Sequence, residues 1–397
     1  MLYPSRKEGA ALRTVIRFIK ETDFYLLFLC LLASGLGVVM VHSATLYKLT
    51  EGQTVYRDTI VMIAAVALGV VLCLIISAID YEVIMKLWPI VAGASLLLML
   101  LLFKFGTGPA GRSDVKTWLD FGVVYFQPSE LLKTAFIITF SVHLELVGRD
   151  LNRLVNILLL GVHGAIPTLL VVLTGDMGSA LVFLMIFVVM MFLAGVKLRY
   201  FAIALGTVIA AAPIVWIKVF NTIQRDRFLA LLYPESYEDI IYQQMRGKTA
   251  IGTGQLFGKG LFKGPLTQAG YVPEAKNDMI LSAVGEELGF VGCMALLILF
   301  LLLILRIVRI ARFTDDNPGK YLCYGVAAMI ASQVIVNVGM VLMYLPVIGI
   351  TLPFMSAGGS ANLCIYIAMG LVFSVYRVNK NQTPVDFRVI NLYTPYR

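Results

Sequence analysis

The sequence predicts an all-α protein that crosses a membrane about ten times. Hydrophobic residues make up 59% and charged residues 14% of the 397 residues, and the mean hydropathy is +0.86. Soluble domains contain about 25% charged residues. Apolar runs of nearly twenty residues recur along most of the chain, and ~20 helical residues cross a ~30 Å hydrocarbon core. A soluble protein with a large core is therefore excluded.

Ten apolar runs are long enough to span a bilayer, and short loops separate most of them. The seventh and eighth runs are instead separated by a long loop, residues 220–277. We expect the whole chain, 1–397, to form a single integral membrane domain. The expected spans lie near residues 24–43, 59–78, 84–104, 129–147, 154–173, 178–195, 199–219, 279–305, 321–345 and 359–377.

The basic residues predict the orientation, because cytoplasmic loops of membrane proteins carry an excess of Lys and Arg. Such residues precede the first span, recur in every second loop and close the chain. Both termini are therefore expected in the cytoplasm, with 378–397 as a cytoplasmic tail and the long loop 220–277 outside. This bias accounts for most of the formal net charge of +8. No basic stripe with interleaved aromatic residues indicates a nucleic acid partner.

The cysteines and histidines predict neither a disulfide nor a metal site. All five cysteines fall inside expected spans without CxxC spacing, and the three histidines are scattered. The first apolar run, about 20 residues long, exceeds the core of a cleaved signal peptide, so we expect it to remain as a signal anchor.

The long loop 220–277 has two halves of different composition. The first half has a helical pattern, whereas the second is rich in glycine and carries Lys248 and Lys259. Backbone N–H groups of a glycine-rich segment can cradle phosphate. The alternative is an irregular loop whose glycines supply positive φ angles.

A second outer loop mixes basic and aromatic residues. Arg112, Lys116 and Trp118 lie in it. Trp118 taken alone would also fit an aromatic residue at the membrane interface.

The fourth expected span begins with an acid and a base. Glu130 and Lys133 are three residues apart, so they share a helix face and can pair. Ionisable residues inside a membrane usually face a cavity and are functional by default. The structural alternative is a pair that locks this helix in place.

Two further outer segments contain polar or helix-breaking residues. Asp176 precedes the sixth span, where capping of that helix is the simplest interpretation. Two prolines and three glycines between residues 344 and 361 predict a broken or re-entrant segment that lines a cavity.

Three acids enter the eighth expected span. Asp278 can cap its N-terminus, but Glu286 and Glu287 lie about 12–14 Å further along a continuous helix. At about 100° per residue the three cannot share one face. At most two of them can therefore line one cavity, and the remaining one must pair with another helix. A carboxylate near the outer surface in such a cavity suits proton abstraction from a hydroxyl.

Four segments resemble, in order, the signature segments of the SEDS family, which includes RodA, FtsW and SpoVE. They are KTWLDFGVVYFQPSELLK, AIGTGQLFGKG, YVPEAKNDMILSAVGEELGFVG and NVGMVLMYLPVIGITLPFMSAGGSA. The resemblance covers residues 105 to 378, and the ten-span layout agrees with it. AIGTGQLFGKG together with Gln268 is more similar to RodA than to FtsW. Asn277 departs from the family's usual Thr, and SAGGSA stands where SYGGSS is common.

This resemblance implies a peptidoglycan glycosyltransferase that polymerises lipid II on the outer face of the bacterial cytoplasmic membrane. The family supports cell-wall growth and cell shape, and it works with a class B penicillin-binding protein. Asp278 matches the position of the family's catalytic aspartate, and Glu130 and Lys133 match its cavity-lining acid and lysine.

The motifs and outer loops supply the remaining candidate positions. Substrate-binding roles are expected for Arg112, Lys116, Trp118, Gln127, Ser129, Lys248, Lys259 and Ser356. Structural roles are expected for Glu286, Glu287 and Asn337.

The hypothesis for the mechanism makes Asp278 the base for the 4-hydroxyl of the acceptor sugar. Lys133 and the outer basic residues would stabilise the departing pyrophosphate. Whether a divalent cation, Mg²⁺ or Mn²⁺, assists them is left open by the sequence. Two alternatives are a flippase that moves lipid II between leaflets and a non-catalytic scaffold for the penicillin-binding protein. The distinctive motifs fall on outer loops and outer helix ends, which favours the enzyme over the flippase.

Overall fold

The computed structural model describes residues 20–50, 52–108, 115–122 and 125–382. Within these residues, nine helices are long and apolar enough to cross a membrane, and the shorter apolar helix Met177–Leu193 stands at the place of the sixth expected span. The prediction of an all-α polytopic membrane protein with about ten spans is confirmed.

The membrane helices follow the predicted order closely. They are α2 (Phe24–Thr45), α3 (Arg57–Ala78), α5 (Trp88–Phe105), α6 (Pro128–Val147), α7 (Leu154–Leu173), α8 (Met177–Leu193), α9 (Leu198–Ile214), α13 (Ile280–Arg312), α14 (Asn317–Val341) and α15 (Gly359–Gln382). The remaining α-helices are α4 (Tyr81–Lys86), α10 (Thr222–Leu232), α11 (Glu238–Gly254) and α12 (Pro265–Gln268).

A small antiparallel sheet lies before α6. Its strands are β1 (Gly106–Thr107), β2 (Trp118–Asp120) and β3 (Tyr125–Phe126), in the order β1-β2-β3. This sheet replaces part of the outer loop that the sequence left without a predicted structure.

Aspartates begin three of the membrane helices. Asp23 accepts a hydrogen bond from Leu26 N at the start of α2, and Asp316 accepts one from Gly319 N at the start of α14. Asp176 accepts from Ser179 N at 2.9 Å, so the interpretation of Asp176 as the cap of α8 is confirmed. Each carboxylate satisfies an N–H group that has no partner within its helix.

Small residues bring α3 and α15 together. A Cβ atom added to Gly69 would lie 2.9 Å from the Tyr366 ring, and one added to Gly370 would lie 2.9 Å from the Cys73 carbonyl. Membrane helices pack through such small residues because lipid supplies little hydrophobic drive between them.

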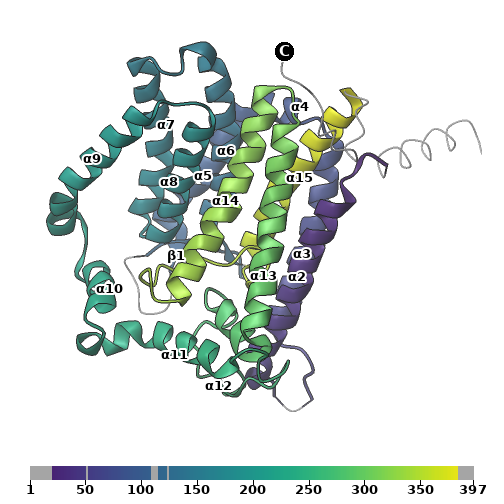
Figure 1. Ribbon diagram of the computed structural model, residues 1–397, viewed down its shortest axis with the longest axis vertical. Coiled ribbons are helices and arrows are strands. Elements are labelled where there is room, and N and C mark those ends of the chain that lie inside the picture. Colours follow the sequence, from purple (N-terminus) through teal and green to yellow (C-terminus); the bar gives the residue numbers. More distant parts are fainter. Residues whose placement is uncertain (1–19, 51, 109–114, 123–124, 383–397) are drawn as a thin grey trace, which may run out of the picture.

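Burial separates a central group of helices from a peripheral one. The most apolar windows of α14 and α15 are 72% buried and that of α6 is 61% buried, whereas that of α9 is 0% buried. Figure 1 shows α9 at the edge of the molecule, apart from the other membrane helices, with α10, α11 and α12 running across one end of the bundle. The site residues lie on the buried group and at this end.

The expectation of a continuous eighth span is wrong. Gly289 has φ 69° and breaks α13, and Phe290 N donates instead to the Gln255 carbonyl at 2.8 Å. Residues 280–288 therefore form a separate helical segment, and the long membrane crossing begins after the break. Asp278 precedes this segment, whose N-cap is Met279 without a side-chain hydrogen bond. Asp278 therefore does not cap α13, and the angular argument relates only Glu286 to Glu287.

The glycine-rich half of the long loop packs against this segment. A Cβ atom on Gly254 would lie 1.9 Å from the Gly285 carbonyl, and one on Gly258 would lie 2.0 Å from that of Glu287. Lys259 N donates to the Glu286 carbonyl at 2.9 Å. These glycines allow close backbone approach, and this N–H group is used within the fold rather than facing a phosphate.

Candidate active site

Asp278 lies at the entry to α13, just before Ile280, and outside the membrane-spanning segments. It is 7% exposed. Gln243 of α11 donates from Nε2 to its Oδ1 over 3.3 Å. This is a long and therefore weak bond.

Burial, together with the neighbouring charge of Glu274, raises the pKa of Asp278 to about 7. The Gln243 hydrogen bond and the charge of Arg227 act in the opposite direction. Near neutral pH this carboxyl exchanges between its protonated and ionised forms, which suits a general base.

Glu130 and Lys133 form a buried ion pair on α6. Their spacing of three residues predicted that they could pair. Lys133 Nζ donates to Glu130 Oε1 at 2.8 Å, and the side chains are 0% and 9% exposed. A charged pair at this depth is expensive to desolvate. The pair is therefore weak evidence of net stabilisation, and the catalytic role of the two residues stays a prediction.

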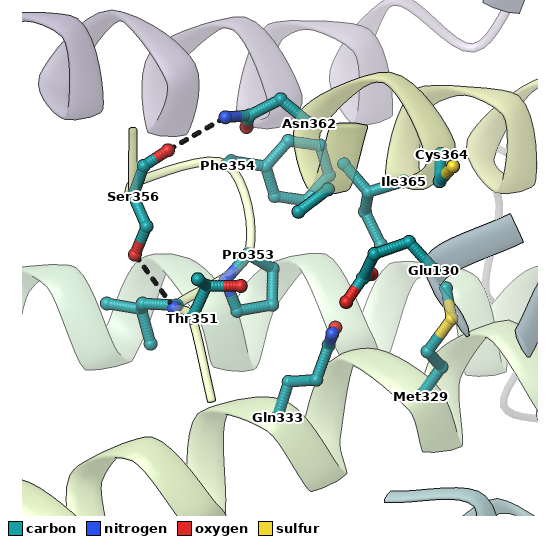
Figure 2. A pocket seen from close by; sticks show the side chains of 12 residues that line it. Glu130, Met329, Gln333, Thr351, Pro353, Phe354, Ser356, Asn362, Cys364 and Ile365 are labelled. Carbon is teal, nitrogen blue, oxygen red and sulfur yellow. Dashed lines mark hydrogen bonds between the residues drawn. The ribbon is translucent and has the colours of Figure 1, made fainter. Parts of the chain in front are cut away.

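Glu130 lines a small cavity of about 10 Å³ between α6, α14, α15 and the segment before α15. This volume holds about one water molecule. Figure 2 shows Glu130 and Gln333 pointing toward each other across it, with Thr351 nearby.

The segment 350–357, which we call the connector, lies between this cavity and Asp278. Thr351 and Ser356 line the cavity, and Ser356 Oγ also donates to the Asn277 carbonyl at 2.7 Å. The predicted re-entrant segment is thus a non-helical one that lines a cavity, as expected. No hydrogen bond or ion pair between described residues links Asp278 directly to Glu130 or Lys133.

Asn337 and Ser356 both contact the backbone beside the carboxylate. Asn337 Nδ2 donates to the Asp278 carbonyl and to the Ile350 carbonyl, each at 2.7 Å. The expected substrate-binding role of Ser356 stays a prediction, while its hydroxyl is occupied within the fold.

Gln127 and Ser129 converge on Asp176, the cap of α8. Gln127 Nε2 donates to Asp176 Oδ2 at 3.0 Å, and Ser129 Oγ lies 3.5 Å from the same oxygen. Their predicted contact with substrate stays a prediction, and both lie at the N-terminal end of α6, next to the N-terminal end of α8.

The remaining substrate-binding candidates come from the two long loops. Lys116 Nζ donates to the Phe103 carbonyl at 2.9 Å near the C-terminal end of α5, and Trp118 is half-buried in β2. Lys248 and Lys259 are exposed. Arg112 lies outside the described residues.

Glu286 and Glu287 are 0% exposed and bind the long loop. Glu286 accepts from Leu266 N and Thr267 N, each at 2.8 Å. Glu287 accepts from Phe262 N at 3.1 Å and from Gln268 Nε2 at 2.9 Å, and also from Ser43 Oγ of α2. The two carboxylates thus connect the loop and α2 to the first segment of α13.

The FtsW, RodA and SpoVE family, described as cell cycle protein, matches residues 24–381. The chain belongs to this family. The peptidoglycan glycosyltransferase MrdB of Escherichia coli K12 is 33% identical over 86% of the chain and 91% of the relative. The probable peptidoglycan glycosyltransferase FtsW of a Geobacter species is also 33% identical, over 91% of the chain and 98% of the relative.

Solved structures agree with this membership in the SEDS family. A chain from a peptidoglycan synthase complex has a TM-score of 0.76 at 28% identity and covers 90% of this chain and 98% of its own. The rod shape determining protein RodA of Thermus thermophilus has a TM-score of 0.66, also at 28% identity, and covers 90% and 97%. Because the MrdB and FtsW relatives are equally identical, the closer likeness to RodA stays a prediction.

The part of this SEDS chain that the structure describes contains no group of three or more His, Cys, Asp or Glu side chains able to hold a metal ion. Asp278 has a neighbouring acid in Glu274, but the site lacks a full set of protein ligands.

Two glutamines of the SEDS site were missed from the sequence. Gln333 is 4% exposed on α14, and a buried polar residue within a span was a usable signal. Gln243 gave no such signal, because it sits in a polar outer loop, and its relation to Asp278 depends on how α11 folds back.

Proposed function

We propose that the chain polymerises lipid II into glycan strands at the outer face of the bacterial cytoplasmic membrane, with Asp278 as general base. Relatives over nearly the whole chain are named peptidoglycan glycosyltransferases. By this relationship the chain is a peptidoglycan glycosyltransferase. The substrate, the membrane face and the base are the proposed part.

The reaction needs one proton acceptor and one leaving group. The acceptor's 4-hydroxyl oxygen attacks the anomeric carbon of the donor, and the bond from that carbon to the pyrophosphate oxygen breaks. The hydroxyl proton passes to the Asp278 carboxylate, and undecaprenyl pyrophosphate leaves with the bonding electrons. A single displacement inverts the α-linked donor to a β-linked product.

The observation that carries the assignment is the state of the Asp278 carboxylate. It is buried, its pKa is raised to about 7, and the side-chain donor to it is 3.3 Å away. General bases work best with a pKa near the operating pH and contribute about 10²–10⁴-fold to rate. Glu286 and Glu287, in contrast, are bound by several donors each.

Lys133 and Glu130 supply the second part of the proposal. Lys133 is fully buried, so in this arrangement it does not contact the donor phosphates. We assign to Lys133 a positive charge that acts on the leaving group through a medium of low dielectric constant. Glu130 holds that charge in place.

A class B penicillin-binding protein is the proposed partner. A peptidoglycan synthase complex is among the similar solved structures, and the family resemblance points to this class of transpeptidase. We place both termini in the cytoplasm, because Lys and Arg are in excess before the first span, in every second short loop and in the C-terminal tail.

The deciding experiment is polymerisation of labelled lipid II by the purified chain in detergent. It uses a cognate partner whose transpeptidase serine is replaced, and arms without partner and with a chelator. We expect glycan polymers longer than the dimer. A flippase or a scaffold lacks polymerase activity and would give no polymer, and in detergent transport between leaflets cannot contribute. Absence of polymer would therefore remove the enzymatic proposal.

A further inference from the structure

Three consecutive carbonyl groups before α13 are held by donors from α14 and the connector 350–357. The three bonds are Ala357 N to the Lys276 carbonyl (2.9 Å), Ser356 Oγ to the Asn277 carbonyl (2.7 Å) and Asn337 Nδ2 to the Asp278 carbonyl (2.7 Å). They fix the backbone that carries the Asp278 carboxylate. The carboxylate itself accepts a long bond from the Gln243 side chain and a hydrogen bond from its own backbone.

The connector that provides two of these donors is itself fixed. Ser356 Oγ accepts from Leu352 N at 2.9 Å, and Asn362 Nδ2 donates to the Ser356 carbonyl at 2.8 Å. The second of these bonds joins the connector to the first turn of α15, as Figure 2 shows. Asn337 donates to the Ile350 carbonyl at the connector's other end.

Two neighbouring helices pack closely against the connector and the residues just before it. A Cβ atom on Gly37 of α2 would lie 2.5 Å from the Phe354 carbonyl, and one on Gly178 of α8 would lie 2.4 Å from that of Ile348. Side chains other than hydrogen at these glycines would displace the segment. The Phe354 ring also packs edge-on against Tyr366, with centroids 5.4 Å apart.

We propose that Asn337 and Ser356 are positioning residues that place the Asp278 carboxylate at the acceptor hydroxyl by fixing the carbonyls of residues 277 and 278. The inference rests on the proposed function of Asp278. It gives Ser356 a role other than the substrate contact expected from its motif. It also links the cavity at Glu130 to Asp278, because Ser356 belongs to both.

Misplacement of a reacting group by about 1 Å can cost on the order of 10²-fold in rate. Loss of either donor should therefore lower kcat about 10- to 100-fold and leave KM for lipid II nearly unchanged. A substrate-contact role for Ser356 predicts the reverse, a raised KM with kcat retained.

The test measures kcat and KM of lipid II polymerisation for Ser356→Ala, Ser356→Thr and Asn337→Leu, with melting temperature as a control for folding. Ser356→Thr keeps the hydroxyl and should keep most of kcat. Ser332→Ala removes another buried hydroxyl of the region, whose Oγ donates to the Ala328 carbonyl within α14. It should leave both constants unchanged.

The outcomes separate this inference from the proposed function. Absence of polymer from the wild-type chain overturns the function and the inference with it. Wild-type polymerisation with unchanged kcat in Ser356→Ala overturns the inference alone, as does a change confined to KM. If Asn337→Leu does not fold, the comparison of Ser356→Ala with Ser356→Thr decides whether Ser356 is a positioning residue.

Discussion

Asp278 and the pair Glu286–Glu287 belong to one short motif, yet their carboxylates have opposite surroundings. The oxygens of Glu286 and Glu287 accept hydrogen bonds from backbone amides and polar side chains of the long loop and α2. The Asp278 carboxylate accepts only a long bond from another residue's side chain and a bond from its own backbone, whereas its backbone carbonyl accepts a 2.7 Å bond from Asn337. Saturated carboxylates hold a structure together, whereas a carboxylate fixed through its backbone keeps its lone pairs available for a proton.

The largest effect is expected from Asp278→Asn. The amide cannot accept the hydroxyl proton, so polymerisation should fall by about 10²–10⁴-fold. The melting temperature and partner binding should stay close to wild type, since the backbone bonds do not involve the side chain. Residual activity above a tenth of wild type would contradict the role of this carboxylate as base.

Lys133→Met is expected to lower polymerisation by about 10²–10³-fold, the usual cost of losing one preorganised electrostatic group. It also leaves Glu130 buried without its cation, which destabilises the fold. The double variant Glu130→Gln/Lys133→Met removes that unpaired charge. It should recover the melting temperature but not the activity; recovery of both would make the pair structural only.

Glu286→Gln is expected to change stability rather than chemistry. Weakening the bonds from Leu266 N and Thr267 N to a charged acceptor costs about 1.5–3 kcal/mol. The variant should therefore melt at a lower temperature and keep kcat per folded molecule within a few-fold. Glu145→Gln, at an exposed position on α6, is the control and should leave both unchanged. If Glu286→Gln is stably folded but loses as much activity as Asp278→Asn, the two acids do not have the different roles assigned here.

The smallest effects are opposite shifts of the pH profile. Glu274→Gln removes a negative charge that raises the pKa of Asp278, so the acid limb of kcat/KM should move to lower pH. Gln243→Ala removes a hydrogen bond that lowers this pKa, so the limb should move to higher pH. Shifts in the same direction in both variants would show that another group sets the limb.

Composition and span length were enough to predict the membrane helices, because the bilayer restricts them to long apolar helices. The break at Gly289 was not predictable from the apolar pattern. It depends on carbonyls of the long loop, Gln255 and Leu256, which receive the N–H groups of Phe290 and Val291. The same loop folds back as α11 and brings Gln243 to Asp278.

The candidate acids were found because ionisable residues are costly at membrane depth. Their separate roles could not be predicted from the sequence, because residue spacing does not show which donors surround each carboxylate oxygen. Ser356 shows the limit most clearly. Its motif suggested substrate contact, while its hydroxyl lies between Leu352 N and the Asn277 carbonyl.

The most direct test of the account is the pH dependence of kcat/KM for lipid II polymerisation, from about pH 5 to 9, in wild type and Asp278→Asn. The unionised acid cannot accept a proton, so the wild-type rate should rise about tenfold per pH unit below the pKa of Asp278. It should level off above the inflection, expected at about pH 7. In Asp278→Asn this inflection should disappear from the residual activity. A wild-type profile that is flat across this range, or an inflection that survives in Asp278→Asn, would contradict the assignment of Asp278 as the base.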